Sequence, residues 1–181
     1  PLTISVTNVN ERPIDLALSS TTVTEGSASG LLVGRLMSTD PDVGDTHTYA
    51  LVAGSGDTDN AAFEIVGNEL RAKQAFDYES QASYTIRIRS TDAAGESVEK
   101  PLVIAVLNAN EAPTVLSLSH SVVLEGTGPG LPIGNFATLD PDVGDTFTYD
   151  FATGTGSADN DSFEIVNGTL TTKAPLSFNA K

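Results

Sequence analysis

The stretch Asp40-Pro41-Asp42-Val43-Gly44-Asp45-Thr46 occurs a second time, without change, at residues 140–146. The copies begin at positions 40 and 140, so the repeat period is 100 residues. The same spacing relates residues 8–11 to 108–111, Glu25-Gly26 to Glu125-Gly126, and 63–66 to 163–166. Most of the residues that recur are acidic residues, asparagines and glycines. A purely structural repeat would instead reuse the apolar positions of its core. Oxygen-bearing side chains at fixed loop positions therefore predict a site for a hard cation in each copy.

The composition narrows the classes of partner. The 181 residues include 24 acidic and 9 basic side chains, and the formal charge of −15 argues against binding to nucleic acid or an anionic membrane surface. There is no cysteine, so no disulfide can stiffen the repeats, and bound metal would be an alternative staple. No apolar run approaches the roughly 18–20 residues of a membrane span, which predicts no membrane insertion. The first residues do not resemble a signal peptide, so we expect a soluble fragment whose export signal lies elsewhere.

Alternation of apolar and polar residues predicts an all-β fold. In Tyr84-Thr85-Ile86-Arg87-Ile88-Arg89 the apolar side chains fall on one face of a half-buried strand. Residues 101–106 have the same pattern, and their counterparts 1–6 are then the last strand of a preceding repeat. Further strands are expected at 16–24, 32–38, 46–52, 62–66 and 69–72, separated by Gly, Asp and Asn clusters. Seven strands in 100 residues predict tandem antiparallel Greek-key β-sandwiches, the second of them incomplete.

This register predicts three segments. Residues 1–13 are the last strand and linker of a preceding repeat, 14–113 a complete repeat with its linker, and 114–181 the first part of a second repeat. The second copy has no counterparts of the strands at 83–90 and 98–107. Either a fragment boundary lies here, or the missing strands come from another chain or from sequence beyond an inserted domain. We expect weak protection of 114–181 from hydrogen exchange unless a second chain covers it.

Ten side chains of the complete repeat and its linker are candidate oxygen ligands. Calcium accepts six to eight oxygens in loose geometry, so ligands from several loops can converge on it. Collected without a cation, the same carboxylates would repel one another. The candidates are Glu25, Asp40, Asp42, Asp45, Asp77, Glu79, Asp92, Asn108, Asn110 and Glu111.

Five of these motifs, in their order along the chain, resemble the calcium motifs of cadherin repeats, especially the cadherin-like repeats of large bacterial surface adhesins. They are Glu25-Gly26, Asp40-Pro41-Asp42, Asp77-Tyr78-Glu79, the segment 92–95 and the linker 108–113. The resemblance covers nearly the whole chain. It implies a cadherin- or immunoglobulin-like sandwich, with calcium ions at the junctions between repeats as the cofactor.

The resemblance also implies which residues bind the ions. The central junction would use Glu25, Asp77 and Glu79, then Asn108, Asn110 and Glu111 of the linker, and Asp140 and Asp142 of the second repeat. The N-terminal junction would use Asn8, Asn10 and Glu11 with Asp40, Asp42 and Asp92.

The sequence departs from the family at several of these positions. Asn108 stands where aspartate is usual, and Asn110-Glu111 replaces the Asn-Asp of animal cadherins, which lowers the charge at the junction. In the second repeat Ser177-Phe178-Asn179 replaces Asp77-Tyr78-Glu79, so two carboxylates are lost.

Other interpretations compete with calcium. Asp-Pro-Asp and Asn-Glu-Ala-Pro are also good turn sequences. An EF-hand does not fit, because the glycine of the repeated stretch is misplaced and Leu51 stands where glutamate is needed. His47 and His120 have Phe147 and Ser20 as counterparts, so neither is expected to be a catalytic base or zinc ligand. The segment 54–60 is expected to be a flexible hairpin rather than another calcium loop.

These observations favour a calcium-rigidified extracellular spacer, a stalk repeat in a cell-surface adhesin that supports cell adhesion and biofilm formation. Its partners would be calcium and the neighbouring repeats of the same chain, with self-association through the incomplete second repeat. The alternative is that the repeats themselves bind carbohydrate or associate homophilically, although the chain has no tryptophan. An enzyme is not expected, because no nucleophile–base pair is evident.

Overall fold

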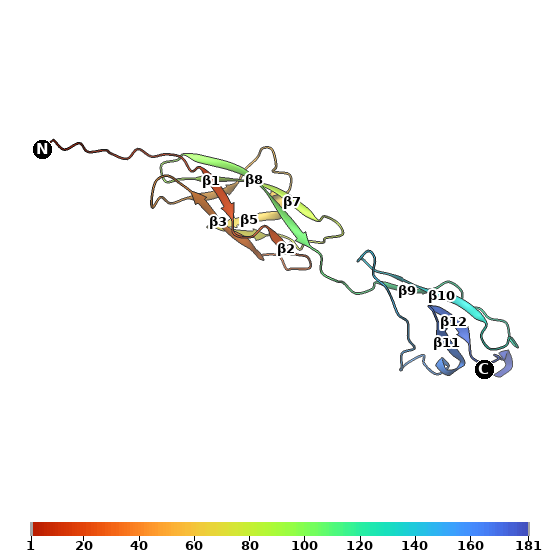
Figure 1. Ribbon diagram of the computed structural model, residues 1–181. Helices are drawn as coiled ribbons and strands as arrows, with labels where there is room; N and C mark the ends of the chain where they lie inside the picture. The colour runs from red at the N-terminus through yellow and green to blue at the C-terminus, as the bar shows by residue number, and fades with distance from the viewer. Residues whose placement is uncertain (1, 181) are drawn as a thin grey trace. The chain divides into compact units, whose positions relative to one another are not determined.

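The computed structural model describes residues 2–180, which form two compact units, up to residue 109 and from residue 110 (Figure 1). Strands and loops make up both units, with three short 3₁₀ turns at Asn60–Ala62, Asn160–Ser162 and Phe178–Ala180. None of these turns is long or apolar enough to cross a membrane. The predicted all-β fold is confirmed.

Unit 1 is a sandwich of two four-stranded sheets. One sheet has the order β1 (Asp15–Leu18), β3 (Leu32–Thr39), β6 (Glu69–Ala72), β5 (Phe63–Val66). The other has the order β2 (Thr22–Thr24), β8 (Ser97–Leu107), β7 (Ser83–Thr91), β4 (Thr48–Leu51). Every neighbouring pair is antiparallel except β2 and β8, which run parallel and pair Val23 with Val106. The expected antiparallel sandwich therefore carries one parallel edge.

The predicted first strand at 16–24 is divided between the two sheets. Its first part, β1, pairs with β3, whereas β2 pairs with β8. The chain crosses over at Ser19–Thr21, where the Ser19 N–H donates to the Arg35 carbonyl at 2.9 Å and the Ala105 N–H donates to the Thr21 carbonyl at 2.8 Å. A single continuous strand was thus the wrong expectation, because alternation of side chains does not say which sheet each half joins.

Gly34 allows the crossover chain to lie against β3. A Cβ atom at this position would lie 2.9 Å from the Ser20 carbonyl oxygen and 3.0 Å from the Ser20 nitrogen. The β3–β6 register also shifts between Leu32 and Gly34. Glycine is required here for space rather than for an unusual backbone angle.

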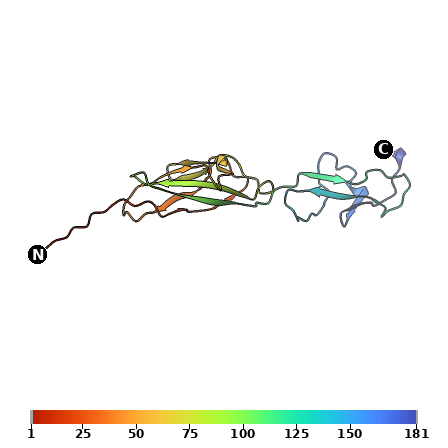
Figure 2. The ribbon, with the colours of Figure 1, turned by 90° about the horizontal axis from the view of Figure 1, so that it is seen from above.

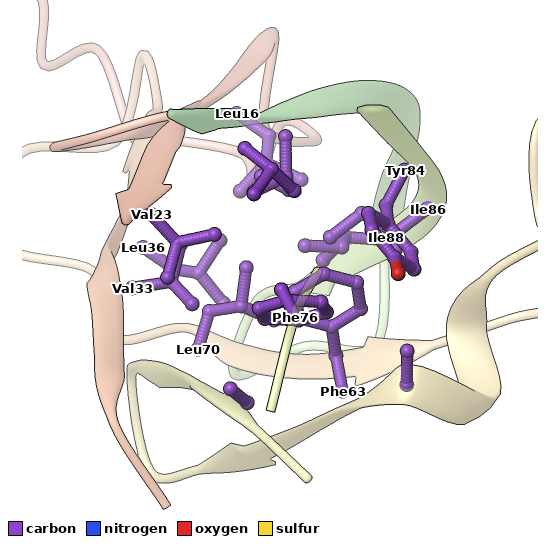
Figure 3. Close-up of a cluster of buried hydrophobic side chains, with 14 residues drawn as sticks. Leu16, Val23, Val33, Leu36, Phe63, Leu70, Phe76, Tyr84, Ile86 and Ile88 are labelled. Carbon is purple, nitrogen blue, oxygen red and sulfur yellow. The ribbon is translucent and has the colours of Figure 1, made fainter. Parts of the chain in front are cut away.

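The core of unit 1 lies between its sheets (Figure 3). Strand β7 alternates as predicted, and Tyr84, Ile86 and Ile88 are all buried. Tyr84 packs on Phe63 and Phe76, with ring centroids 6.0 and 4.7 Å away. Burial of such side chains contributes about 1.5–3 kcal/mol each, so this cluster is a large favourable contribution to the stability of unit 1.

The segment 54–60 connects the two sheets and is not a hairpin, because β4 pairs with β7 while β5 pairs with β6. Its polar side chains hold it against β7. The Asp59 carboxylate accepts the Thr85 N–H at 2.6 Å, and the Asn60 side-chain oxygen accepts the Arg87 N–H at 2.9 Å. The expected flexible hairpin was therefore wrong, and these residues instead join a crossover loop to a core strand.

Unit 2 repeats the first sheet of unit 1. Its strands have the order β11 (Phe163–Val166), β12 (Thr169–Thr172), β10 (Pro132–Leu139), β9 (Val115–Leu118). Among its described residues no strand corresponds to β7 or β8. The burial reflects this difference, since Leu16 is 0% exposed whereas its counterpart Leu116 is 64% exposed.

Candidate metal centre

The repeated stretch forms the same carboxylate loop in both units. In unit 1 the Asp42 N–H donates to Asp40 Oδ1 at 2.9 Å, and in unit 2 the Asp142 N–H donates to Asp140 Oδ1 at 3.0 Å. Gly44 follows with a φ of +94°, a value that glycine adopts readily. The interpretation of these residues as a turn is thus correct, and the turn brings three carboxylates of each copy together.

One oxygen from each carboxylate of such a loop lies within 4.8 Å of the others, in Asp40, Asp42 and Asp45 and again in Asp140, Asp142 and Asp145. Calcium–oxygen distances are about 2.3–2.6 Å, so two ligands of one ion can be up to about 5 Å apart. The donors are all hard oxygens. The set therefore fits calcium in both spacing and chemistry.

Two buried oxygens of these loops have no hydrogen-bond partner, Asp45 Oδ2 in unit 1 and Asp140 Oδ2 in unit 2. Asp40 Oδ2 does have a partner, because His47 Nε2 lies 2.9 Å from it. The counterpart of His47 is Phe147, which cannot make that bond. Leaving a buried carboxylate oxygen unpaired is costly, and a bound cation would remove the cost.

The linker that precedes unit 1's sandwich is bound to this loop. The Glu11 N–H donates to Asp42 Oδ2 at 2.7 Å, and the Asn8 side-chain amide donates to Asp42 Oδ1. These two bonds, that from Asn8 first, lower the pKa of Asp42, because they stabilise its ionised form. The loop is thus held as an anion beside the linker.

Asp92 binds the same linker from the loop between β7 and β8. Its Oδ2 accepts the Asn10 side-chain amide at 3.0 Å, while its Oδ1 accepts the N–H groups of Ala94, Gly95 and Glu96. Burial acts to raise the pKa of Asp92, but these hydrogen bonds, that from Asn10 first, together lower it. Asp92 therefore stays ionised near neutral pH.

The linker residues that begin unit 2 repeat this arrangement. The Glu111 N–H donates to Asp142 Oδ2 at 2.7 Å, as Glu11 does to Asp42. The Asn110 amide donates to the Glu111 carbonyl at 2.9 Å, and the Asn10 amide to the Glu11 carbonyl at 3.2 Å. The contacts of Asn-Glu with the carboxylate loop are therefore a property of the repeat.

Glu25, Asp77 and Glu79 form a second cluster, at the end of unit 1 where β8 finishes, with one oxygen from each within 4.8 Å of the others. Glu25 is 5% exposed, and its two oxygens accept the Tyr78 and Ala109 N–H groups, each at 2.7 Å. The Asn108 amide donates to Glu79 Oε1 at 3.3 Å. This cluster therefore holds the start of the following linker.

Asp77 is fixed within this cluster by Ser80. The Ser80 backbone N–H donates to Asp77 Oδ1 at 2.8 Å and the Ser80 hydroxyl donates to Oδ2 at 2.9 Å. These bonds, the backbone one first, lower the pKa of Asp77. Asp77 is therefore ionised at neutral pH and can serve as a cation ligand.

The counterpart of this cluster in unit 2 keeps one carboxylate. Glu125 Oε2 accepts the Phe178 N–H at 3.2 Å, as Glu25 accepts that of Tyr78. Ser177 and Asn179 stand in place of Asp77 and Glu79, and no three-carboxylate group forms around Glu125 within residues 110–180. The two copies therefore share the hydrogen bond from the backbone to the glutamate, but unit 2 lacks the two further carboxylates of the cluster.

Each unit brings its own predicted residues together. Asn8, Asn10, Glu11, Asp40, Asp42 and Asp92 meet at one end of unit 1, Glu25, Asp77, Glu79 and Asn108 at the other, and Asn110, Glu111, Asp140 and Asp142 in unit 2. The assignment by resemblance left out Asp45, which the sequence had already offered as a candidate oxygen ligand, and its counterpart Asp145. Their signal was available, because both belong to the unchanged seven-residue stretch. The role of all these residues as ligands stays a prediction.

Comparison with known proteins agrees with this fold. A family model described as "Cadherin domain" matches residues 19–107. Human Cadherin-24 is 28% identical over 198 residues, covering 99% of this chain and 24% of that protein. Human Protocadherin-16 is 33% identical over 153 residues, covering 80% of this chain and 5% of that protein. The chain thus spans a quarter or less of the length of these curated relatives.

A solved structure shows the same architecture. The crystal structure of human Protocadherin-24 EC1-2, form II, matches with a TM-score of 0.66 and 20% identity, covering 94% of this chain and 82% of that one. At 20% identity this match shows the fold alone. The family model, in contrast, matches the amino-acid sequence itself. Residues 19–107 are accordingly recognised as a cadherin domain.

Proposed function

We propose that this chain is a calcium-binding cadherin-type repeat segment that serves as a stiff spacer in an extracellular adhesion protein. The observation that supports the proposal is that carboxylates of the acidic clusters accept hydrogen bonds from backbone N–H groups of the linker. The carboxylate that accepts the Glu111 N–H, Asp142, belongs to an acidic cluster, and so does Glu25, which accepts the Ala109 N–H.

The ligands in this proposal are the residues assigned above by resemblance, together with Asp45 and Asp145. Asp45 and Asp140 each have a buried oxygen that lacks a hydrogen bond and would gain a calcium ion as partner. Asn8 and Asn108 can contribute a carbonyl oxygen once the side-chain amide turns over, since their NH₂ groups now donate to carboxylates. Calcium would neutralise part of the −15 formal charge where it is most concentrated.

The mechanical role follows from the same contacts. Without calcium, repulsion among the clustered carboxylates weakens the loops that hold the linker. Calcium would lock Glu25 and Asp142 in place and with them the linker N–H groups that they accept. End-to-end repeats with restricted linkers give length at little cost, because a strand of ten residues spans about 33 Å.

The cellular location and the kind of full-length protein that contains this segment are also part of the proposal. A cadherin domain, a strongly acidic surface and millimolar extracellular calcium are mutually consistent with a cell-surface or secreted protein. The finer assignment, to the stalk of a large bacterial adhesin that acts in biofilm formation, rests on the sequence resemblance alone.

Thermal unfolding in chelator and across a calcium titration tests the binding. Extracellular calcium modules have Kd values on the order of 10⁻⁴–10⁻³ M, so the titration extends to several tens of millimolar. At 100 times Kd a single site adds about 2.7 kcal/mol of stability, which appears as a rise in Tm. The variant Asp77→Ala/Glu79→Ala/Asp142→Ala should lose most of this rise.

A matched control removes the same number of charges outside the clusters, in the variant Glu64→Ala/Asp150→Ala/Asp161→Ala, whose side chains are exposed. It should keep the calcium response. No response in the unaltered chain, or an equal response in both variants, would refute calcium binding at the clusters. Small-angle scattering tests the spacer role, and a maximum dimension that is the same in calcium and chelator would exclude stiffening.

A further inference from the structure

The two copies of the seven-residue stretch are identical in sequence, yet each leaves a different aspartate with a free oxygen. Among the described residues, the buried oxygen of the stretch without a hydrogen-bond partner is Asp45 Oδ2 in unit 1 and Asp140 Oδ2 in unit 2. Asp140 is the counterpart of Asp40, the first aspartate of the stretch, whereas Asp45 is the third. The stretch itself cannot cause this difference, because its residues are the same in both units.

The sequence differs at the first residue after the stretch. His47 stands there in unit 1, and Phe147 takes its place in unit 2. His47 Nε2 lies 2.9 Å from Asp40 Oδ2, and these two side chains are 10% and 4% exposed. An ionised carboxylate has no proton to give, so the imidazole N–H is the donor. A phenylalanine ring has no such donor, and Asp140 Oδ2 is left without a partner.

The turn between β3 and β4 brings His47 to Asp40. Strand β3 ends directly before Asp40 and β4 begins directly after His47, so the two side chains lie just outside strands of different sheets. The segment 40–47 lies at the end of unit 1 at which the linker 8–11 enters (Figures 1 and 2). The hydrogen bond therefore closes this loop across its base.

The backbone of the two loops does not explain the difference. The Asp42 and Asp142 N–H groups donate to the first aspartate of their loops at 2.9 and 3.0 Å, and both carboxylates accept a linker N–H at 2.7 Å. Gly44 and Gly144 have φ values of +94° and +104°. The loops therefore share their turn and their bond to the linker, and the donor at position 47 distinguishes them.

This donor changes what a cation gains on binding. A cation that binds in unit 2 gives Asp140 Oδ2 a partner and removes the cost of a buried, unpaired oxygen. At Asp40 the imidazole of His47 already removes that cost, so a cation gains less there or must displace the imidazole. Binding in unit 1 should therefore depend on Asp45, whose free oxygen has no competing donor.

We propose that His47 moves the principal cation ligand of the unit 1 loop from the first aspartate to the third, whereas the first aspartate keeps this role in unit 2. The principal ligand is the aspartate whose carboxylate contributes most to binding. His47 is thus a positioning residue that acts through Asp40. Because the loops are those of the proposed calcium sites, this role of His47 rests on the proposed function.

A calcium titration followed by NMR of the isotope-labelled chain measures the two loops separately, because each contains one glycine amide, Gly44 or Gly144. The titration is made at one pH and extends to several tens of millimolar. His47→Phe gives unit 1 the side chain of unit 2, and calcium should then bind the unit 1 loop about 10-fold more tightly. Phe147→His should weaken binding in unit 2 by a similar factor.

Thermal unfolding distinguishes this role from a merely structural one. In chelator, His47→Phe should lower the Tm of unit 1, because Asp40 Oδ2 loses its donor. A structural histidine would lose stability and calcium affinity together, whereas we expect lower stability in chelator with higher affinity. His47→Gln is the conservative control, since its side-chain amide can donate to Asp40 Oδ2, and it should bind calcium like the unaltered chain.

Aspartate-to-asparagine changes identify the principal ligand of each loop. In unit 1, Asp45→Asn should weaken calcium binding more than Asp40→Asn does. In unit 2 the order should be the opposite, with Asp140→Asn more harmful than Asp145→Asn. In the His47→Phe chain the unit 1 order should change to that of unit 2, and a double-mutant cycle measures this coupling.

Two kinds of failure can be told apart. If the unaltered chain shows no calcium-dependent shift at either glycine, the proposed function fails and the role of His47 fails with it. If both loops bind calcium but His47→Phe leaves the affinity of unit 1 unchanged or lowers it, only the role of His47 is overturned. If His47→Phe does not fold, Phe147→His decides, and an unchanged affinity in unit 2 would overturn that role.

Discussion

At the scale of single residues, the repeated stretch combines a turn with a set of cation ligands. Asp40 shapes the loop by accepting the Asp42 N–H, and Gly44 allows the positive φ that the loop needs. Asp45 contributes a buried oxygen without a partner, which the loop itself does not explain. A turn alone would need only the hydrogen bond to Asp40 and the backbone of the loop. Asp45, the third aspartate of the stretch, is therefore the residue that favours a metal site over a plain turn.

Gly34 gives a prediction at the same scale. The change Gly34→Ala places a Cβ atom about 3 Å from the Ser20 backbone, so the crossover from β1 to β2 must move. We expect unit 1 to lose about 1–3 kcal/mol of unfolding free energy. Denaturant unfolding in chelator measures the loss. Gly128→Ala, which has no atom within 4 Å of the added Cβ, is the control and should change stability little.

At the scale of elements, β7 and β8 are joined on their outer face by a charged ladder. Glu99 accepts hydrogen bonds from Arg87 at 2.9 Å and from Arg89 at 2.8 and 2.6 Å. Arg89 lies directly opposite Glu99 in the register. The ladder therefore ties together the two strands that close the core of unit 1.

The ladder predicts a pH dependence. Hydrogen bonds from Arg89, and then from Arg87, hold the pKa of Glu99 below its ordinary value of 4.5. A depressed carboxylate pKa contributes stability above the ordinary value, and this contribution is lost as the pH falls through the folded pKa. In chelator the Tm of unit 1 should fall between about pH 6 and pH 3. Glu99→Gln should make that fall smaller by a few degrees, whereas Glu96→Gln, at an exposed loop position, should not. An unchanged slope in Glu99→Gln would show that the ladder contributes nothing.

The comparison of β6 with β12 shows how neighbours decide burial. Leu70 in β6 is 0% exposed, and its counterpart Leu170 in β12 is only partly buried. Both strands pair with equivalent neighbours, β3 and β5 in unit 1 and β10 and β11 in unit 2. The difference arises on the face that the second sheet covers in unit 1.

At the scale of the whole molecule, the described residues of unit 1 form two sheets and those of unit 2 form one. Hydrogen exchange on this chain in chelator should therefore separate the two units. We expect amides of β12 to exchange about 100-fold or more faster than those of β6, which corresponds to roughly 2.7 kcal/mol. The residues 2–7 serve as the unprotected reference. Equal protection of β6 and β12 would mean that the sheet of unit 2 is stable without a second sheet.

Much of this could be predicted from the sequence. Alternation in Tyr84–Arg89 identified a core strand, and the repeat register located the acidic loops around Asp40 and Asp140. These features are local or recur at a fixed spacing, so they can be found without knowledge of the packing. The same register predicted a strand at 1–6, but residues 2–6 form no strand, because among the described residues no neighbouring strand pairs with them.

The tertiary structure decided the rest. Only packing shows that 16–24 divides at Ser19–Thr21, that β2 lies parallel to β8, and that 54–60 crosses between sheets. Only packing shows that Asp45 has a buried oxygen without a partner and that His47 lies against Asp40. The sequence by itself determined which residues could form strands and carry oxygen ligands, because those are properties of each side chain and its spacing. Which distant segments meet, and which polar atoms are left without water or a partner, depends on the packed chain as a whole.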